Sequence, residues 1–441
     1  MASTILIKNA LILTSADAEP IERGSVLVRQ GRIARVGRFI ARADMTIDAE
    51  GGLLMPGLIQ GHIHLCQTLF RGLGEDMALL PWLRNVIWPL EAVHDEESIY
   101  LSALLSCAEL IKSGTTAFLS IETVRHTRHV LRAVHEAGMA GVIGHCLMDE
   151  TGGYDPLAVD IEDALADLDV LRDEWEGHPR IRLAVAPRFA LSCSARNMRL
   201  AAEYARENGL RLHTHSSEQI EEVELVRTRT GLPNIEYLHS VGLTGPDVGL
   251  AHCVHTEPHE RDILRETGTS VLHCPSANLK LGSGIAPIPE YLQMGINVAL
   301  GADGAPCNNR LDPFLEMREA GLLQKIRLGP AALPAREIVR MATEGGARAL
   351  GWQDEMGTLE VGKRANLILV DPAGVSALPS ADPLTNLVYS HAASDVRMTM
   401  VDGRILYEDG ELTTIDEERL RDAVLRARAR LMRKAGLQPP D

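Results

Sequence analysis

The chain has 441 residues, of which 45% are hydrophobic and 24% are charged, as in an ordinary soluble globular protein. Its formal charge of −16 opposes contact with phosphate backbones, which excludes nucleic acid as an expected partner. No apolar run reaches the roughly 18 residues of a membrane span, so we expect no membrane partner, and seven scattered cysteines without a CxxC pair favour the reducing cytoplasm.

Both ends of the chain have the alternating pattern of short β-strands joined by turns. The N-terminal part contains ILIKNALILT (5–14), SVLVRQGRIARVG (25–37) and MTIDAEGGLLMPG (45–57), with a hairpin expected at RQGR. The C-terminal part contains GTLEVGKRANLILVDP (357–372) and VRMTMVDGRILYEDG (396–410), with a hairpin at Asp-Gly. We expect residues 1–56 and 357–412 to form the two halves of one composite β-sandwich, and residues 413–441 to carry an amphipathic helix.

Helix and strand alternate between these two parts. A helix predicted over 94–114 ends at Gly114, before the strand TTAFLSI (115–121). Six more helix-then-strand units follow, with their strands in 139–149, 181–192, 210–218, 248–255, 269–276 and 296–304. A parallel α/β barrel needs about 250 residues. The pattern therefore predicts the α/β class and a TIM-like (β/α)8 barrel over residues 57–356.

Histidines and one aspartate gather where the predicted barrel strands end. In the stretch PGLIQGHIHLCQ, His62 and His64 are two residues apart on a strand and so point to the same side of it. An isolated pair of this kind is more often an accident that satisfies local hydrogen bonds. Four later strands, however, end in His215, His252, His273 and Asp303. Catalytic groups of such barrels come from this end of the strands, so we expect these side chains to converge.

Three imidazoles and a carboxylate that converge on one point indicate a metal site. Imidazole nitrogen with carboxylate oxygen suits Zn²⁺, with Fe²⁺ or another divalent ion as the alternative. Such a metal lowers the pKa of a coordinated water to about 7, which makes hydroxide available at neutral pH. His213 lies on the same strand face as His215 and competes with it for the ligand role. We prefer His215 because Glu218 follows it by three residues.

Two residues near these ligands have both a functional and a structural interpretation, and a third is assigned no role. Glu218 either begins the solvated acidic run EQIEEVE or acts as a proton shuttle, and its place beside a metal histidine favours the shuttle. His252 is either a satisfied core histidine or the group that polarises the substrate or holds the hydroxide, and we favour the second. His273 is expected to lie behind the ligands, with no role assigned.

The motifs together resemble the amidohydrolase superfamily. They are PGLIQGHIHLCQTLFRG, HTHSSE, AHCVH, LHCPSANLKLGSGIAP and LGADGAPCNN, in this order, and the likeness extends over essentially the whole chain. Within the superfamily they look like the branch of methylthioadenosine/S-adenosylhomocysteine deaminases, 5′-deoxyadenosine deaminases and s-triazine hydrolases. The resemblance implies a (β/α)8 barrel with a composite β-sandwich from both termini. It also implies a homo-oligomer.

The same resemblance implies a set of roles. It makes His62, His64, His215 and Asp303 the ligands of a single catalytic metal, since no Lys stands where two-metal branches carry a bridging carbamylated lysine. Glu218 would then take the proton of the attacking water and hand it to a ring nitrogen, while His252 assists the hydroxide. Asp303 would help to protonate the departing ammonia, because an amine is a poor leaving group.

The substrate is expected to be a small aminoheterocycle or nucleoside. Trp82 and Glu91, in LLPWLRNVIWPLE, match positions where adenosine-type deaminases stack on the base and bind the ribose hydroxyls. Arg188 and Phe189, in APRFALSCS, depart from the His that many S-adenosylhomocysteine deaminases carry. We expect a 5′-substituted adenosine, such as 5′-deoxyadenosine, methylthioadenosine or S-adenosylhomocysteine, to yield its inosine analogue and ammonia.

Three other functions stay open from the sequence. Arg188 and Gln67 also resemble the Arg and Gln with which guanine deaminases bind the purine, so guanine or another aminopurine is the second hypothesis. An s-triazine carrying chloro or amino groups is the third. A metal-binding barrel without turnover is the non-enzymatic hypothesis, and Glu218 argues against it because a binding protein does not need a shuttle.

Overall fold

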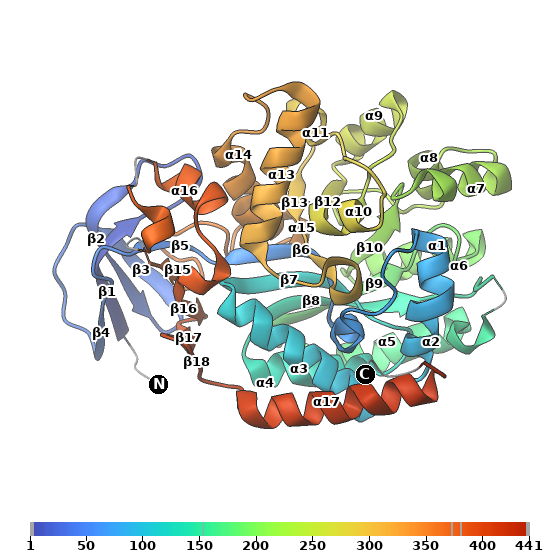
Figure 1. The fold of residues 1–441 in the computed structure, drawn as a ribbon, viewed down its shortest axis with the longest axis horizontal. Coiled ribbons are helices and arrows are strands. Elements are labelled where there is room, and N and C mark those ends of the chain that lie inside the picture. Colours follow the sequence, from blue (N-terminus) through green and yellow to red (C-terminus); the bar gives the residue numbers. More distant parts are fainter. Residues whose placement is uncertain (1–3, 153, 372–373, 380–381, 438–441) are drawn as a thin grey trace.

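Figure 1 shows the computed structural model, in which a barrel lies beside a sheet built from both ends of the chain. The structure describes residues 4–152, 154–371, 374–379 and 382–437. Each of the predicted segments 1–56, 57–356, 357–412 and 413–441 includes residues outside this described part, namely 1–3, 153, 372–373 with 380–381, and 438–441.

The barrel consists, in the described residues, of parallel strands whose order in the sheet follows the chain. They are β6 (Leu58–His64), β7 (Thr115–Ile121), β8 (Ala140–Leu147), β9 (Ile181–Pro187), β10 (Arg211–Ser216), β11 (Val248–His252), β12 (Ser270–His273), β13 (Val298–Leu300) and β14 (Asp303–Gly304). β13 pairs with β12, and β14 pairs with β6. Since β13 and β14 are two halves of one segment, these pairings close the sheet. The predicted (β/α)8 barrel is confirmed.

The eighth strand is predicted as continuous over 296–304, but the structure breaks it between β13 and β14. Gly301 lies in the break and packs against the backbone of β6. A Cβ added to Gly301 would lie 2.6 Å from the carbonyl oxygen of His62, which is closer than atoms can approach. Glycine thus allows the eighth strand to pass directly over the strand that carries the two histidines.

Helices surround the barrel (Figure 1), and short helical turns cover its carboxyl end. The helices that begin before residue 260 are α1 (Leu79–Trp82), α2 (Trp88–Ala92), α3 (Glu96–Lys112), α4 (Thr127–Ala137), α5 (Ile161–Trp175), α6 (Ala195–Glu207), α7 (Ile220–Thr230), α8 (Asn234–Ser240) and α9 (Pro258–Thr267). They are followed by α10 (Pro275–Lys280), α11 (Ile288–Gln293), α12 (Ala305–Asn308), α13 (Pro313–Leu328), α14 (Ala335–Arg340), α15 (Gly346–Leu350), α16 (Pro383–Tyr389) and α17 (Glu417–Lys434).

Several shorter helical segments complete the chain. They are the 3-10 turns Leu65–Phe70, Asp155–Leu157, Val375–Ala377 and Ala393–Asp395 and the π-helical turns Leu83–Ile87 and Met341–Gly345. Among the described residues, none of the helices combines the length and apolar character that a membrane crossing requires.

The strands from the two ends of the chain form one nine-stranded sheet, as expected from their pattern. Its order is β18 (Glu411–Leu412), β17 (Arg404–Glu408), β16 (Val396–Val401), β15 (Leu367–Val370), β5 (Leu53–Pro56), β1 (Thr4–Ile12), β2 (Ile21–Arg29) and β3 (Arg32–Gly37), with β4 (Met45–Asp48) paired to β1. The two parts join where β5 runs antiparallel to β15. This sheet encloses a core of its own, which includes Ile7, Leu54, Leu367 and Met400.

Both predicted hairpins are present in this sheet. The turn at Gln30–Gly31 joins β2 to β3, and the turn at Asp402–Gly403 joins β16 to β17. The predicted strand pattern over 357–372 is only partly correct, because the strand β15 begins at Leu367. Gly357 and Gly362 have φ values of 92° and 94°, which extended strands do not use, so the segment before β15 runs as turns.

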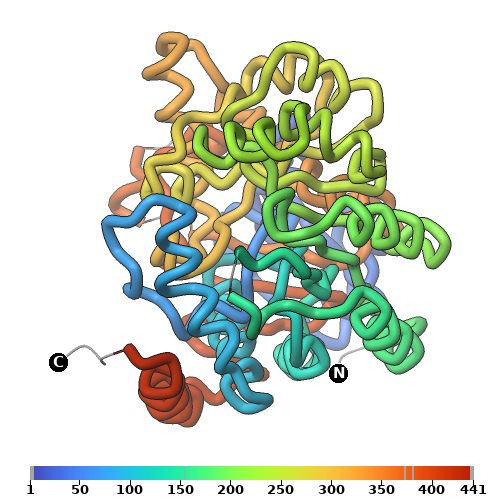
Figure 2. Tube along the Cα trace, turned by 90° about the vertical axis from the view of Figure 1, so that its right-hand side faces the viewer, coloured from blue at the N-terminus to red at the C-terminus, as the bar shows by residue number. Residues whose placement is uncertain are grey.

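The C-terminal helix α17 packs along α3 at the outside of the barrel (Figures 1 and 2). Ion pairs connect Lys112 of α3 to Glu417, and Arg430 of α17 to Glu97, at 2.8 Å each. Leu420 and Leu431 lie on the buried face of α17, which confirms the predicted amphipathic helix.

Candidate active site

Four side chains meet at the carboxyl end of the barrel. His62 and His64 lie at the end of β6, His215 near the end of β10, and Asp303 at the start of β14. One donor atom from each lies within 4.8 Å of the corresponding atoms of the other three. The structure thus brings together the four residues that the sequence singles out as a ligand set.

The hydrogen bonds behind the imidazole rings define which nitrogen faces the centre. Nδ1 of His64 lies 2.7 Å from the carbonyl oxygen of Ile121, and Nδ1 of His215 lies 2.6 Å from that of Arg188. A carbonyl oxygen only accepts, so both Nδ1 atoms carry the proton and both Nε2 atoms present a lone pair. This arrangement is the usual one for metal-binding histidines.

The lone pairs face one another at short range. Nε2 of His64 lies 3.1 Å from Nε2 of His215, and Oδ1 of Asp303 lies 3.2 Å from Nε2 of both His62 and His64. Electron-rich atoms repel one another at these distances in a buried site. A cation among them would turn the repulsion into coordination, so the donor set fits a divalent metal ion.

His213, the predicted competitor of His215, lies behind His62. Its Nε2 is 2.8 Å from Nδ1 of His62, and its own Nδ1 is 3.4 Å from the carbonyl oxygen of Ser120. A proton on each Nδ1 satisfies this chain and leaves Nε2 of His62 free toward the centre. Burial lowers the pKa of His62 to about 4 and that of His213 well below its ordinary value, which keeps both rings neutral.

The backbone at the strand ends adopts the left-handed conformation that non-glycine residues rarely use. φ is 54° at Ser217, 72° at His252, 47° at Cys253 and 62° at Asp303. Such residues cost of order 1–3 kcal/mol each and cluster at functional sites. Here they turn the chain sharply after three strands, so that Glu218, His252 and Asp303 face one centre.

Glu218 and His252 lie beside the four donors. Nε2 of His252 is 3.6 Å from Oε2 of Glu218 and 3.9 Å from Oδ2 of Asp303. Nδ1 of His252 lies 2.8 Å from Oδ1 of Asn278, and its Nε2 has no hydrogen-bond partner in the described part of the chain. The ring is therefore held from behind and presents a free nitrogen to the site.

Glu218 is a buried carboxyl with the electrostatics of a proton carrier. Burial raises its pKa well above the ordinary value, and the charges of Asp303 and Glu222 raise it further. Its Oε1 accepts a hydrogen bond from the Ser283 hydroxyl at 3.3 Å. A buried carboxyl with a raised pKa beside the donor cluster is suited to general acid–base catalysis.

His273 is buried on β12, and neither of its ring nitrogens has a hydrogen-bond partner among the residues that the structure describes. Burial lowers its pKa to about 3, so its ring is neutral. It is not part of the four-residue donor cluster.

A small pocket opens beside the donor cluster. Four of the five predicted substrate-binding residues line it, namely Gln67, Trp82, Arg188 and Phe189. Leu79, Leu83 and Leu281 complete its apolar wall. Glu91, the fifth, is buried and contacts Gln67 and Arg188. The pocket therefore offers flat aromatic and apolar surfaces next to a polar, metal-binding end.

Glu91 links the two polar residues of the pocket. Its Oε1 accepts from Nε2 of Gln67 at 2.8 Å and from Nη2 of Arg188 at 3.0 Å, and its Oε2 accepts from Nη1 of Arg188 at 2.5 Å. Both side chains of this ion pair are almost fully buried. Arg188 also contacts one of the four donor residues, because its carbonyl oxygen accepts a hydrogen bond from Nδ1 of His215.

Replacing Arg188 by Met is expected to lower the free energy of unfolding by about 3–5 kcal/mol, because it leaves the Glu91 carboxylate buried and unpaired. Urea denaturation followed by circular dichroism measures this loss. The double variant R188M/E91L removes both charges and should recover most of the stability. A loss below about 1 kcal/mol in the single variant would contradict a buried pair.

Two further buried residues lie at the site, Glu122 and Cys307, and neither is among the site residues predicted from the sequence. Oε2 of Glu122 accepts from the backbone N–H of Cys66 at 2.9 Å, and burial raises the pKa of Glu122 to about 7. Sγ of Cys307 lies 3.2 Å from Oδ2 of Asp303 and 3.1 Å from the carbonyl oxygen of Gly304. Burial raises the pKa of the Cys307 thiol well above its usual value, so it stays a protonated donor.

The thiol of Cys307 is expected to help orient Asp303 toward the metal. Replacement by Ala should weaken metal affinity by about 10-fold or more, as is typical for groups that hold a ligand in place. Replacement by Ser keeps a donor and should retain most of the affinity. Competition with a chelator measures both. Equal affinities for the Ala variant and the unchanged protein would show that the contact has no such effect.

The strands and loops that form this site lie in a part of the chain that matches a known protein family. Residues 53–406 match the amidohydrolase family. The chain belongs to this family. It is thus a hydrolase acting on carbon–nitrogen bonds, of a family that is metal-dependent.

Two curated relatives of this amidohydrolase are about equally similar to it. A 5-methylthioadenosine/S-adenosylhomocysteine deaminase of Syntrophobacter fumaroxidans is 40% identical over 95% of this chain and 96% of its own. A 5′-deoxyadenosine deaminase of Methanothermobacter thermautotrophicus is 40% identical over 97% of this chain and 99% of its own. Both matches extend over nearly the full length of each protein, as the resemblance of the motifs predicts.

A solved structure supports the same relationship. An adenosine deaminase from Xanthomonas campestris, crystallised with bound zinc, superposes on this amidohydrolase with a TM-score of 0.91 and 30% identity. The match covers 97% of this chain and 98% of the other.

Proposed function

We propose that the chain is a metal-dependent deaminase that hydrolyses the exocyclic amine of a 5′-substituted adenosine to give the inosine analogue and ammonia. The observation that carries the proposal is the buried Glu218, whose pKa burial raises, next to three converging imidazoles and Asp303. The two relatives at 40% identity, which are named as deaminases of 5′-deoxyadenosine and of methylthioadenosine and S-adenosylhomocysteine, support the choice of substrate.

Each residue of the site has a separate role in the proposed reaction. A divalent cation held by His62, His64, His215 and Asp303 would lower the pKa of water toward neutrality. Glu218 accepts the proton of the attacking water and delivers it to the ring nitrogen beside the reacting carbon. Asp303, through Oδ2, assists the protonation of the departing ammonia. His252 offers its free Nε2 to the oxygen that attacks the ring.

We infer that this cation is Zn²⁺, one per chain, with Fe²⁺ as the alternative. Three nitrogen donors and one carboxylate oxygen suit zinc. The zinc of the Xanthomonas campestris structure supports the same choice. Metal analysis of the purified protein tests it, and a substoichiometric or a two-metal content would contradict it.

The lining of the pocket supports a purine ring as the group that is bound. Trp82 and Phe189 are aromatic and buried, and with Leu79, Leu83 and Leu281 they offer apolar contact to a flat heterocycle. Gln67 has a side-chain oxygen without a partner among the described residues. This oxygen is thus free to accept a hydrogen bond from a bound substrate.

Guanine is the second candidate substrate because both Gln67 and Arg188 line the pocket. The ion pair with Glu91 weakens this candidate, since it engages both terminal nitrogens of the Arg188 guanidinium. An s-triazine is the third candidate, on the resemblance of the motifs alone. A barrel that binds metal without turnover would leave the buried Glu218 without a use.

A panel of substrates scored by ammonia release tests the proposal. Adenosine, 5′-deoxyadenosine, methylthioadenosine, S-adenosylhomocysteine and guanine are incubated with metal-loaded protein, and a chloro-s-triazine is scored by halide release. The highest kcat/KM should belong to a 5′-substituted adenosine. Fastest turnover of guanine would favour the second candidate. Release of halide alone would favour the third, and no release from any compound would contradict a deaminase.

We also infer a cytoplasmic location and a homo-oligomeric state. All seven cysteines are free thiols and buried, which supports a reducing compartment. The oligomeric state rests on the resemblance to the family, and light scattering on the purified protein tests it.

A further inference from the structure

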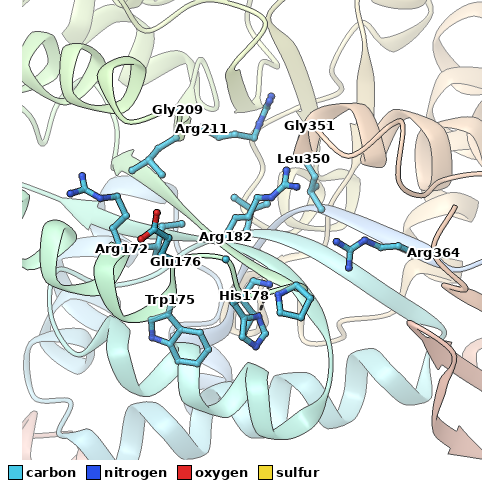
Figure 3. Close-up of a pocket in the computed structure, with 16 residues that line it drawn as sticks. Arg172, Trp175, Glu176, His178, Arg182, Gly209, Arg211, Leu350, Gly351 and Arg364 are labelled. Atoms are coloured by element: carbon cyan, nitrogen blue, oxygen red, sulfur yellow. Dashed lines mark hydrogen bonds between the residues drawn. The ribbon is translucent and has the colours of Figure 1, made fainter. Parts of the chain in front are cut away.

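A second cavity lies at the opposite end of the barrel from the candidate active site. Its volume is about 520 Å³, within the usual range for small-molecule sites. Its walls come from the start of β9, the start of β10 and the end of α15, represented by Ile181, Arg211 and Leu350. Figure 3 shows Trp175 and His178 on one side of it.

The charge of this cavity is opposite to that of the chain as a whole. The protein carries a net charge of −16, yet four arginines line the cavity against one carboxylate, Glu176. The arginines are Arg172, Arg182, Arg211 and Arg364 (Figure 3). A concave surface with this charge attracts small anions.

Three of the arginines have carboxylate partners. Arg172 pairs with Asp169 at 2.9 Å. Arg182 and Arg364 share Glu355, each at 2.6 Å, and Arg364 also pairs with Asp402 at 3.0 Å. Their guanidinium groups are therefore held in place.

Arg211 differs from these three, because no carboxylate lies within 4.0 Å of it in the part of the chain that the structure describes. Its Nη2 donates to the carbonyl oxygen of Pro246 at 3.2 Å, and its Nε is buried without a partner. Burial lowers the pKa of Arg211 to about 10, and the charge of Asp247 opposes this shift. Arg211 is half-buried, and a bound anion would supply the charged partner that its guanidinium group lacks.

The walls around Arg211 suit an organic anion as well as an inorganic one. The guanidinium carbon of Arg182 lies 5.1 Å from the ring centre of Trp352, which fixes that arginine against a flat surface. Trp175, Leu183 and Leu350 add apolar area. The cavity thus combines a positive centre with space and surface for a small carbon skeleton.

We propose that this cavity binds a small anion through a phosphate or carboxylate group, with Arg211 as its main contact. The proposal does not depend on the substrate of the active site, which lies beyond the other end of the same strands. The ligand class follows from the guanidinium group, which forms paired hydrogen bonds with phosphate and carboxylate oxygens.

Isothermal titration calorimetry tests the proposal on the full-length, metal-loaded protein at constant ionic strength. The probes are inorganic phosphate and succinate, which separate a phosphate-type from a carboxylate-type ligand. We expect one saturable site for at least one probe. Loss of a hydrogen bond to a charged group should weaken that binding about 10-fold or more in R211M.

Two further variants make the result specific. R199M removes an exposed arginine of α6 outside the cavity and should leave the affinity unchanged. E176Q removes the lining carboxylate, which is exposed, and should tighten binding because a repulsive charge is lost. The proposal is overturned if neither probe binds saturably, or if R211M binds as tightly as R199M. The second result would assign the binding to another site, such as the metal.

Discussion

Replacing Glu218 by Gln is expected to lower kcat by about 10²–10⁴-fold while leaving the metal content unchanged. The amide has almost the same shape as the carboxyl, but it cannot carry a proton from water to the ring. Glu218 lies outside the four-residue donor cluster, so the variant should still bind the metal. Ammonia release and metal analysis on the same preparation measure the two quantities separately.

The neighbouring Glu221 provides a matched control for this experiment. It is exposed on α7, three residues further along the same acidic run, and E221Q should keep full activity. If E218Q were as active as E221Q, Glu218 would not be the proton shuttle. If E218Q lost both activity and metal, the carboxyl would have a structural role at the donor cluster.

Removing the metal is expected to abolish ammonia release and to destabilise the fold. Without a cation, the Nε2 lone pairs of His64 and His215 face each other at 3.1 Å in a buried site. A ligand that binds only the folded state stabilises it by about 4 kcal/mol when its free concentration is 1,000 times Kd. Dialysis against a chelator should therefore lower both the activity and the denaturation midpoint.

The return of both properties on adding Zn²⁺ completes this test. Mg²⁺ serves as the control, because it prefers oxygen ligands and an octahedral shell and should restore neither. Metal-free protein that still released ammonia at an undiminished rate would contradict a metal-dependent reaction. Recovery with Fe²⁺ but not with Zn²⁺ would replace the inferred ion while keeping the site.

Three of the four donor residues could be predicted because they lie at the end of an apolar strand segment of the barrel. A strand buried on both faces is conspicuous in sequence, and polar residues at its end stand out against it. His62, His64 and Asp303 meet this condition, whereas His215 lies on the more polar strand β10 and is marked instead by Glu218, three residues further on. Their convergence then follows from the barrel, whose parallel strands all end on one side.

The contacts between these residues and their neighbours could not be predicted in the same way. Glu91 lies in the short helix α2, and its ion pair with Arg188 depends on how that helix packs against the end of β9. Cys307 contacts Asp303 because a tight turn follows β14. Such contacts depend on tertiary packing, for which periodicity and composition give no signal.

The split eighth strand has a consequence for the order of events during synthesis. A nascent chain that has emerged as far as Leu300 already contains three of the four donors, but not Asp303. Asp303 enters the cluster through β14, whose pairing with β6 also joins the last edge of the barrel to the first. The complete donor set and the closed ring therefore arise in the same step, so that capture of the ion would mark the moment at which folding of the barrel is finished.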